Sequence, residues 1–236
     1  MQEISFKIID KLPLHYKEAL NYVIEESKKI YKENLLSIFL AGSGGKGNII
    51  ENWSDLDLYF ITKDFVIESN AKLFSKVKDN KYNIHIGTTF YTLDMINKLN
   101  VDTKTLVAFY EYKNLNCNLF VYKNLEIKDI KFEDIICNNK EINDLIQIVG
   151  RELYVYKLNK NNFKTLIKKM TLLVKVYLIK KYNELIYGYN DVFKKLNILE
   201  NIDINIDIEK IIERKVINDI ELKYFSDIIN IIIEGI

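Results

Sequence analysis

Residues 37–62 read SIFLAGSGGKGNIIENWSDLDLYFIT, and they carry the clearest structural pattern in the chain. An apolar run, 37–41, is followed by a cluster of four glycines and one lysine, 42–47, and later by an alternating run, 55–62. Apolar and alternating runs of this length are typical of β-strands, and clustered glycines are typical of a tight turn. The stretch therefore predicts a strand, a glycine-rich turn, a short loop and a second strand.

Two carboxylates stand at the start of the second predicted strand, at Asp55 and Asp57. Residues two apart in a strand project to the same face, so both should lie side by side while Leu56 and Leu58 enter the core. Neighbouring carboxylates repel each other without a cation, and Mg²⁺ prefers carboxylate, phosphate and water oxygens. The pair therefore predicts a magnesium site. The alternative is that Ser54 and Asp55 cap a turn and Asp57 is an ordinary solvated side chain.

The glycine cluster offers groups that bind phosphate. Exposed backbone N–H groups and the Ser43 hydroxyl can hold the outer phosphates of a nucleoside triphosphate, beside a positively charged lysine. We therefore predict Gly42, Ser43 and Lys46 as nucleotide-binding residues, with Asp55 and Asp57 as metal ligands that share the same phosphates.

Two other phosphate-binding motifs compete for the same cluster. Gly42, Gly44 and Gly47 match the G-x-G-x-x-G fingerprint of dinucleotide-binding folds. That fingerprint must begin a crossover connection of about ten or more residues, and only residues 48–54 precede the next predicted strand. A P-loop is excluded because Asn48 follows Gly47, where a lysine and then a serine or threonine are required.

The run Ala41-Gly42-Ser43, a gap of residues 44–54, and then Asp55-Leu56-Asp57-Leu58 resembles the signature of the polymerase-β-type nucleotidyltransferase superfamily. The resemblance covers residues 37–62. It implies that the two aspartates hold one or two Mg²⁺ ions and that the glycine and serine hold the triphosphate of an NTP such as ATP. It further implies transfer of a nucleoside monophosphate to an acceptor, with release of pyrophosphate.

The order of a small αβ domain and a helical domain resembles the antibiotic nucleotidyltransferases, such as those that modify kanamycin or lincosamides. This resemblance implies a small-molecule acceptor, with a protein as the alternative. The superfamily usually places a third carboxylate on the next core strand, where this chain has His85. His85 is expected either to act as a general base, to mark a nucleotide-binding module without turnover, or to be a structural histidine. Glu111 and Asp94 are possible substitute bases.

The rest of the chain predicts an α+β protein. Helical spacing is seen at 14–33 and 68–79, a strand pattern at 82–91, and a weaker hairpin pattern at 107–112 and 118–122. Four amphipathic segments then predict a helical bundle: 142–158, 163–185, 191–199 and 208–233. We expect a mixed-sheet nucleotidyltransferase domain at 1–125 and a helical acceptor-side domain at 126–236, with Mg-NTP and acceptor in the cleft between them.

Composition excludes several classes of protein. The net charge of +1 gives no overall attraction to a long nucleic acid, and no apolar run reaches the roughly 18 residues of a membrane span. Residues 1–10 carry no signal-like apolar core, so a cytoplasmic protein is expected. Cys117 and Cys137 lack the spacing of zinc ligands and are expected to be small buried side chains. A helical ribonuclease of the toxin–antitoxin type is disfavoured, because no histidine follows His85.

Overall fold

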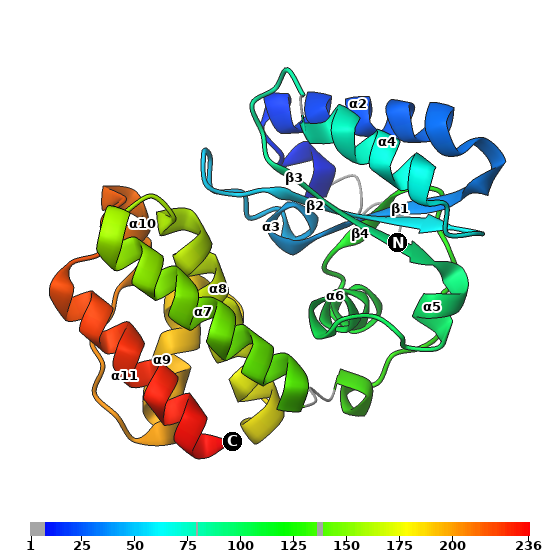
Figure 1. The fold of residues 1–236 in the computed structure, drawn as a ribbon. Helices are drawn as coiled ribbons and strands as arrows, with labels where there is room; N and C mark the ends of the chain where they lie inside the picture. The colour runs from blue at the N-terminus through cyan, green and yellow to red at the C-terminus, as the bar shows by residue number, and fades with distance from the viewer. Residues whose placement is uncertain (1–7, 79, 136–138) are drawn as a thin grey trace. The chain divides into compact units, whose positions relative to one another are not determined.

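A four-stranded mixed sheet lies at the centre of the N-terminal part of the chain, with its strands in the order β3-β2-β1-β4 (Figure 1). The structure is a computed structural model that describes residues 8–78, 80–135 and 139–236. The strands are β1 (Leu35–Ala41), β2 (Leu56–Thr62), β3 (Ile86–Thr92) and β4 (Leu119–Tyr122). β1 is antiparallel to both β2 and β4, whereas β2 is parallel to β3. The predicted mixed sheet is confirmed.

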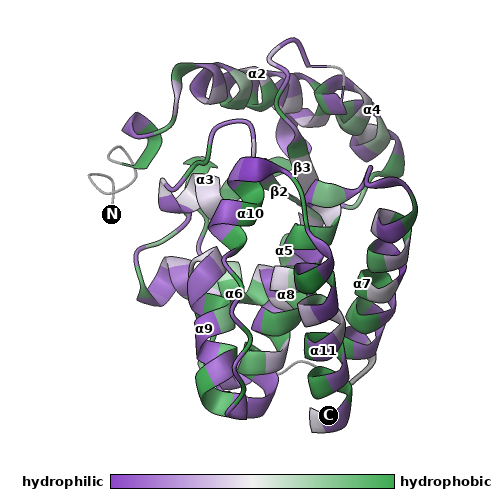
Figure 2. Ribbon diagram, turned by 90° about the vertical axis from the view of Figure 1, so that its left-hand side faces the viewer, coloured by the Kyte–Doolittle hydropathy of each residue, from purple (hydrophilic) through white to green (hydrophobic). Residues whose placement is uncertain are grey.

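Helices cover both faces of this sheet. α2 (Leu14–Tyr31) and α4 (Ile67–Lys78) lie on one face, and α6 (Thr103–Asn114) lies on the other (Figure 1). Hydrophobic and hydrophilic residues alternate along α2 and α4, as expected of helices with one buried side (Figure 2). Because side chains alternate along β2, Leu56 and Leu58 are fully buried in the core with α2 and α4. Asp57 is thereby directed to the face that α6 covers, where Lys104 contacts it.

The segment 107–112, predicted as a strand of a hairpin, is helical and belongs to α6. Asp102 caps this helix by accepting a hydrogen bond from the backbone N–H of Thr105 at 2.8 Å. Leu106 and Phe109, three positions apart, are both buried on one side of the helix. The cap and this spacing outweigh the strand preference of the aromatic residues.

Short elements connect the larger ones. They are η1 (Lys32–Asn34), α3 (Gly42–Lys46), α5 (Leu93–Asn97) and η2 (Phe132–Ile135). The predicted glycine-rich turn is thus a single helical turn, α3, between β1 and the loop that leads to β2. Gly47, with φ of 69°, ends that turn in the left-handed region that glycine adopts without strain.

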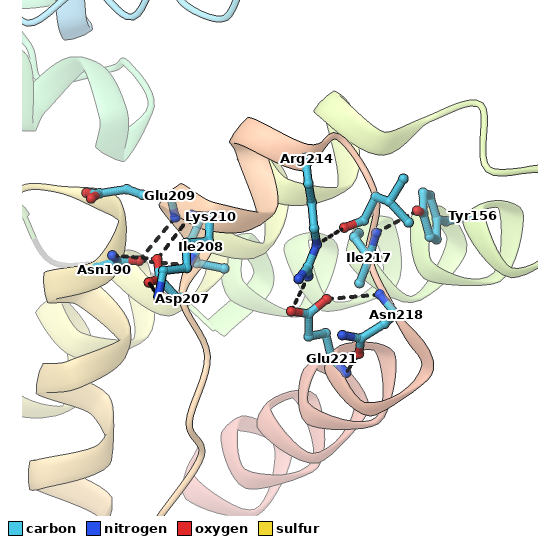
Figure 3. A network of polar contacts seen from close by, with 11 residues as sticks. Tyr156, Asn190, Asp207, Ile208, Glu209, Lys210, Arg214, Ile217, Asn218 and Glu221 are labelled. Atoms are coloured by element: carbon cyan, nitrogen blue, oxygen red, sulfur yellow. Dashed lines mark hydrogen bonds and ion pairs between the residues drawn. The ribbon is translucent and has the colours of Figure 1, made fainter.

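Helices form the C-terminal part of the chain. They are α7 (Asn139–Asn159), α8 (Phe163–Tyr182), α9 (Tyr189–Glu200), α10 (Ile208–Arg214) and α11 (Asp219–Gly235). The segment 208–233, predicted as one helix, is two, because Lys215 has a left-handed φ of 57° and Asn218 starts α11 with a capping box. Arg214 and Glu221 form an ion pair across this break (Figure 3). The α+β class with a helical C-terminal region is confirmed.

The chain forms two compact units, residues 1–134 and 135–236. This division lies a few residues beyond the predicted boundary after residue 125. The backbone N–H of Lys128 donates a hydrogen bond to Asn97 Oδ1 on α5 at 3.1 Å, which attaches the segment after that boundary to the first unit. Within the described residues, no helix is both long and apolar enough to span a membrane.

Candidate functional site

The end of β1 brings Gly42 against Asp57. Ala41 is paired with Asp57 in the antiparallel register of β1 and β2, and Gly42 follows directly as the first residue of α3. Gly42 has a φ of 67°, and a Cβ atom placed on it would lie 2.6 Å from Asp57 Oδ2. Only glycine fits this position, because any side chain would be strained and would displace the carboxylate.

The parallel pairing of β2 and β3 places Gly87 on the other side of Asp57. The two residues are paired in register, and a Cβ atom on Gly87 would lie 3.0 Å from Asp57 Oδ1. Gly42, directly after β1, and Gly87, on β3, therefore leave room for the Asp57 carboxylate between them, and that side chain is 28% exposed. Sequence reasoning missed Gly87. Only the register between β2 and β3 would have shown that Gly87 lies opposite Asp57, and a single sequence does not contain that register.

His85 and Asp55 lie side by side just before the same two strands. The backbone N–H of Leu56 donates a hydrogen bond to the carbonyl of His85 at 3.1 Å, which aligns the strands. His85 Nδ1 is 3.4 Å from Asp55 Oδ2. The imidazole is 72% exposed, so it is not packed in the core, whereas the Asp55 side chain is only 16% exposed. The structure thus places the three predicted catalytic residues at one end of β2 and β3.

The loop that precedes Asp55 is held in place by α2. Ser54 accepts a hydrogen bond from the backbone N–H of Ile50 through its side chain at 2.9 Å, and its carbonyl accepts one from the Tyr16 hydroxyl at 2.9 Å. Trp53 is buried next to it. Burial and then the negative charge of Asp55 raise the pKa of Tyr16, which keeps its hydroxyl protonated as a donor. These contacts fix the chain position from which Asp55 projects.

α6 contributes a positively charged side chain, that of Lys104, to the site. Lys104 Nζ lies 3.0 Å from Asp57 Oδ1, with the lysine side chain 49% exposed. Nothing in the sequence linked Lys104 to the aspartates, because the segment after it was predicted as a strand. Tyr59 is a buried neighbour of Asp57, and burial and then the charge of Asp57 raise the pKa of its hydroxyl well above its ordinary value. The Tyr59 hydroxyl is therefore neutral.

Lys46 points to a buried carboxylate within the same unit. Its Nζ is 2.8 Å from Glu111 Oε1, and Glu111 Oε2 accepts a hydrogen bond from Asn118 Nδ2 at 2.7 Å. Glu111 is 3% exposed, so the pair braces α3 against α6 and the start of β4. Binding of Lys46 to a triphosphate would leave this buried carboxylate without its ammonium partner, at a substantial cost. A nucleotide contact by Lys46 therefore stays a prediction from the sequence.

The other candidates of the sequence lie elsewhere. Asp94 is exposed on α5, in an ion pair with Lys98 at 2.8 Å. Cys117 is a free, partly buried thiol, and burial and then the charge of Glu111 raise its pKa. That shift disfavours the reactive thiolate. Cys137 lies outside the described residues.

The arrangement is suited to a divalent cation that arrives with phosphates. Among the described residues, no group of three or more histidine, cysteine, aspartate or glutamate side chains is placed to hold a metal by itself. Mg²⁺, however, is typically held by one or two carboxylates and completes its octahedral shell with substrate phosphates and water. The carboxylates of Asp57 on β2 and of Asp55 directly before that strand fit this pattern.

Gly42→Ala should lower the free energy of unfolding by about 1–2 kcal/mol, because alanine is strained at a φ of 67° and its Cβ would collide with Asp57 Oδ2. Urea unfolding measures the change. Gly150→Ala is the matched control, because Gly150 lies within α7 and a Cβ there would meet no atom within 4 Å. That control should be stabilising by about 0.5–1 kcal/mol. A Gly42→Ala protein as stable as the wild type would contradict the close approach.

The sequence matches no protein-family model and no curated protein. The fold, by contrast, is similar to that of a solved structure, the spectinomycin adenyltransferase AAD(9) from Enterococcus faecialis with ATP and spectinomycin. The similarity has a TM-score of 0.60 at 16% sequence identity, and it covers 91% of this chain and 98% of that one. The protein therefore has a nucleotidyltransferase-like fold.

Proposed function

We propose that the protein is a metal-dependent nucleotidyltransferase that transfers a nucleoside monophosphate from Mg-NTP to an acceptor and releases pyrophosphate. The observation that carries the proposal is the position of Asp57, held between Gly42 and Gly87, with Asp55 two positions earlier in the chain, directly before the same strand. The nucleotidyltransferase-like fold supports it. The proposal includes a cytoplasmic location, where nucleoside triphosphates are available.

Each residue has a proposed part in binding. Asp55 and Asp57 would hold Mg²⁺, and the cation would supply positive charge that stabilises the negative charge of the phosphates during the transfer. Gly42 lets the chain pass directly beside Asp57, so that phosphates held at α3 also reach the cation. Ser43 is the second residue of α3 and is proposed to contact those phosphates through its hydroxyl.

The proposed reaction is an in-line displacement at the α-phosphorus. The acceptor oxygen forms a bond to that phosphorus, the bond to the bridging oxygen of the β-phosphate breaks, and pyrophosphate leaves. The acceptor hydroxyl gives its proton to a base, and we propose His85 for that role, because its imidazole is exposed and lies beside Asp55. The similar structure contains ATP and spectinomycin, which makes ATP the first nucleotide to test and a small antibiotic the first class of acceptor.

A second candidate is a nucleotide-binding or regulatory module without turnover. The observation that favours it is that an imidazole, and not a carboxylate, adjoins Asp55 at the start of β3. Both candidates require Mg-NTP binding at the aspartate pair. They differ only in whether a product forms.

Product mass distinguishes the two. The protein should be incubated with each Mg-NTP and a panel of aminoglycosides, spectinomycin, lincosamides and candidate proteins, and the mixtures analysed by mass spectrometry. The nucleotidyltransferase proposal expects an acceptor whose mass increases by one nucleoside monophosphate, with equimolar pyrophosphate. Asp57→Asn is the control for a contaminating enzyme. If Mg-NTP binds but no acceptor gains that mass, the binding module is the better description.

A further inference from the structure

Lys104 lies at an unfavourable place in its own helix. It is the second residue of α6, directly after Thr103, and its side chain is 49% exposed. The N-terminus of a helix carries partial positive charge, so a lysine there is disfavoured by its local surroundings. A residue that breaks a local rule without packing in the core is expected to serve another contact. The contact that the structure shows is the one with Asp57, at 3.0 Å.

A nearer carboxylate is already engaged. Asp102, two residues before Lys104, accepts hydrogen bonds from the Tyr91 hydroxyl at 2.7 Å and from the backbone N–H of Thr105 at 2.8 Å. The Thr105 hydroxyl adds a third at 3.2 Å. With Asp102 committed to these donors as the helix cap, the ammonium group of Lys104 reaches across to β2 and pairs with Asp57 instead.

We propose that Lys104 is a built-in counter-ion of the metal site, which neutralises Asp57 in the metal-free protein and is displaced when a divalent cation binds. The inference rests on the proposed function. An ammonium group 3.0 Å from Asp57 Oδ1 competes with a metal ion for the same carboxylate. The competition lowers the affinity for free metal, so the site fills when the cation arrives together with a triphosphate. Lys104 would thus hinder filling by the free cation, while a metal–nucleotide complex, which also gains phosphate contacts, could still displace it.

The test measures the binding of Mn²⁺ alone, without nucleotide, to the wild type and to Lys104→Met. Trp53 is the single tryptophan of the chain, two residues from Asp55, and its fluorescence should be quenched by bound Mn²⁺. Electron paramagnetic resonance of free Mn²⁺ gives the same affinity directly. At low ionic strength, Lys104→Met should bind Mn²⁺ about two- to fivefold more tightly, as expected for the loss of a partly exposed competing ion pair. The gain should shrink at about 0.5 M salt.

Two controls separate competition from a structural role. Lys104→Arg keeps the charge and should restore an affinity close to that of the wild type. Lys98→Met removes a lysine from another exposed ion pair of the same unit, with Asp94, and should leave Mn²⁺ binding unchanged. If Lys104 had only a structural role, the Mn²⁺ affinity would not depend on whether residue 104 carries a positive charge.

The outcomes are distinct for the counter-ion and for the metal site. Equal or weaker Mn²⁺ affinity in Lys104→Met, with binding that still depends on Asp57, would overturn the counter-ion while leaving the proposed function intact. That result would also be expected if Lys104 contacted only the nucleotide. Mn²⁺ binding that is absent in Lys104→Met as well as in the wild type, or that is unaffected by Asp57→Asn, would overturn the metal site and the counter-ion with it.

Discussion

Asp57→Asn is expected to reduce the rate of nucleotidyl transfer by about 10³-fold or more, because the substitution removes one of the two carboxylates proposed to hold the metal. Asparagine has nearly the same shape and fits between Gly42 and Gly87. The carboxylate forms only a partly exposed ion pair with Lys104, so the free energy of unfolding without ligand should change by less than about 1 kcal/mol. The rate of pyrophosphate release measures the first effect and urea unfolding the second.

The matched control is Asp64→Asn, an exposed aspartate just beyond the other end of β2. It should retain the wild-type rate and stability. A turnover rate that survives Asp57→Asn would show that this carboxylate does not bind the catalytic metal. A large loss of stability would mean instead that Asp57 is chiefly structural.

His85→Ala is expected to lower turnover by about 10²–10⁴-fold while the dissociation constant of Mg-NTP stays nearly unchanged, if the imidazole is the general base. The physical reason is that a base acts on the acceptor hydroxyl during the transfer and has no part in holding the triphosphate. Steady-state rates and equilibrium binding of Mg-ATP, measured on the same preparation, separate the two effects.

The chain provides its own control for this substitution in His15, its other histidine. His15 is 41% exposed and its Nε2 lies 3.8 Å from Glu51 Oε1, so His15→Ala also removes a solvent-accessible imidazole that lies near a carboxylate. It should leave turnover unchanged. Equal losses of turnover and nucleotide affinity in His85→Ala would contradict the role of a base, and so would an unchanged rate.

Much of the fold around the aspartates could be predicted from the alternation of apolar and polar residues within residues 55–62. Because side chains alternate in a strand, the pattern predicted Leu56 and Leu58 in the core and the two aspartates on the other face. The structure shows both leucines buried and Asp57 on the face that α6 covers. The short gap before this run excluded a crossover helix, and β1 and β2 are indeed antiparallel neighbours. These features depend on local spacing, which one sequence contains.

Contacts between distant segments could not be predicted in the same way. Lys104 reaches Asp57 over a separation of 47 residues, and Lys46 meets Glu111 over 65. Both contacts depend on where α6 lies on the sheet. The helix itself was missed because its aromatic residues favour strands, although Asp102 followed by Thr103 and Thr105 offered a capping signal. Lys46 shows the consequence, since its charge suggested phosphate binding and the structure pairs it with a buried carboxylate.

Thermal melting with and without Mg-ATP, on the wild type and Asp57→Asn, tests most directly whether the aspartate pair binds a metal–nucleotide complex. At about 100 times its dissociation constant, Mg-ATP should stabilise the wild type by about 2.7 kcal/mol, which corresponds to a rise in Tm of about 5–10 °C for a chain of this size. Omission of Mg²⁺ should abolish most of that rise, and so should Asp57→Asn with Mg²⁺ present. A rise of the same size in Asp57→Asn, or in the wild type without Mg²⁺, would contradict the assignment of this site.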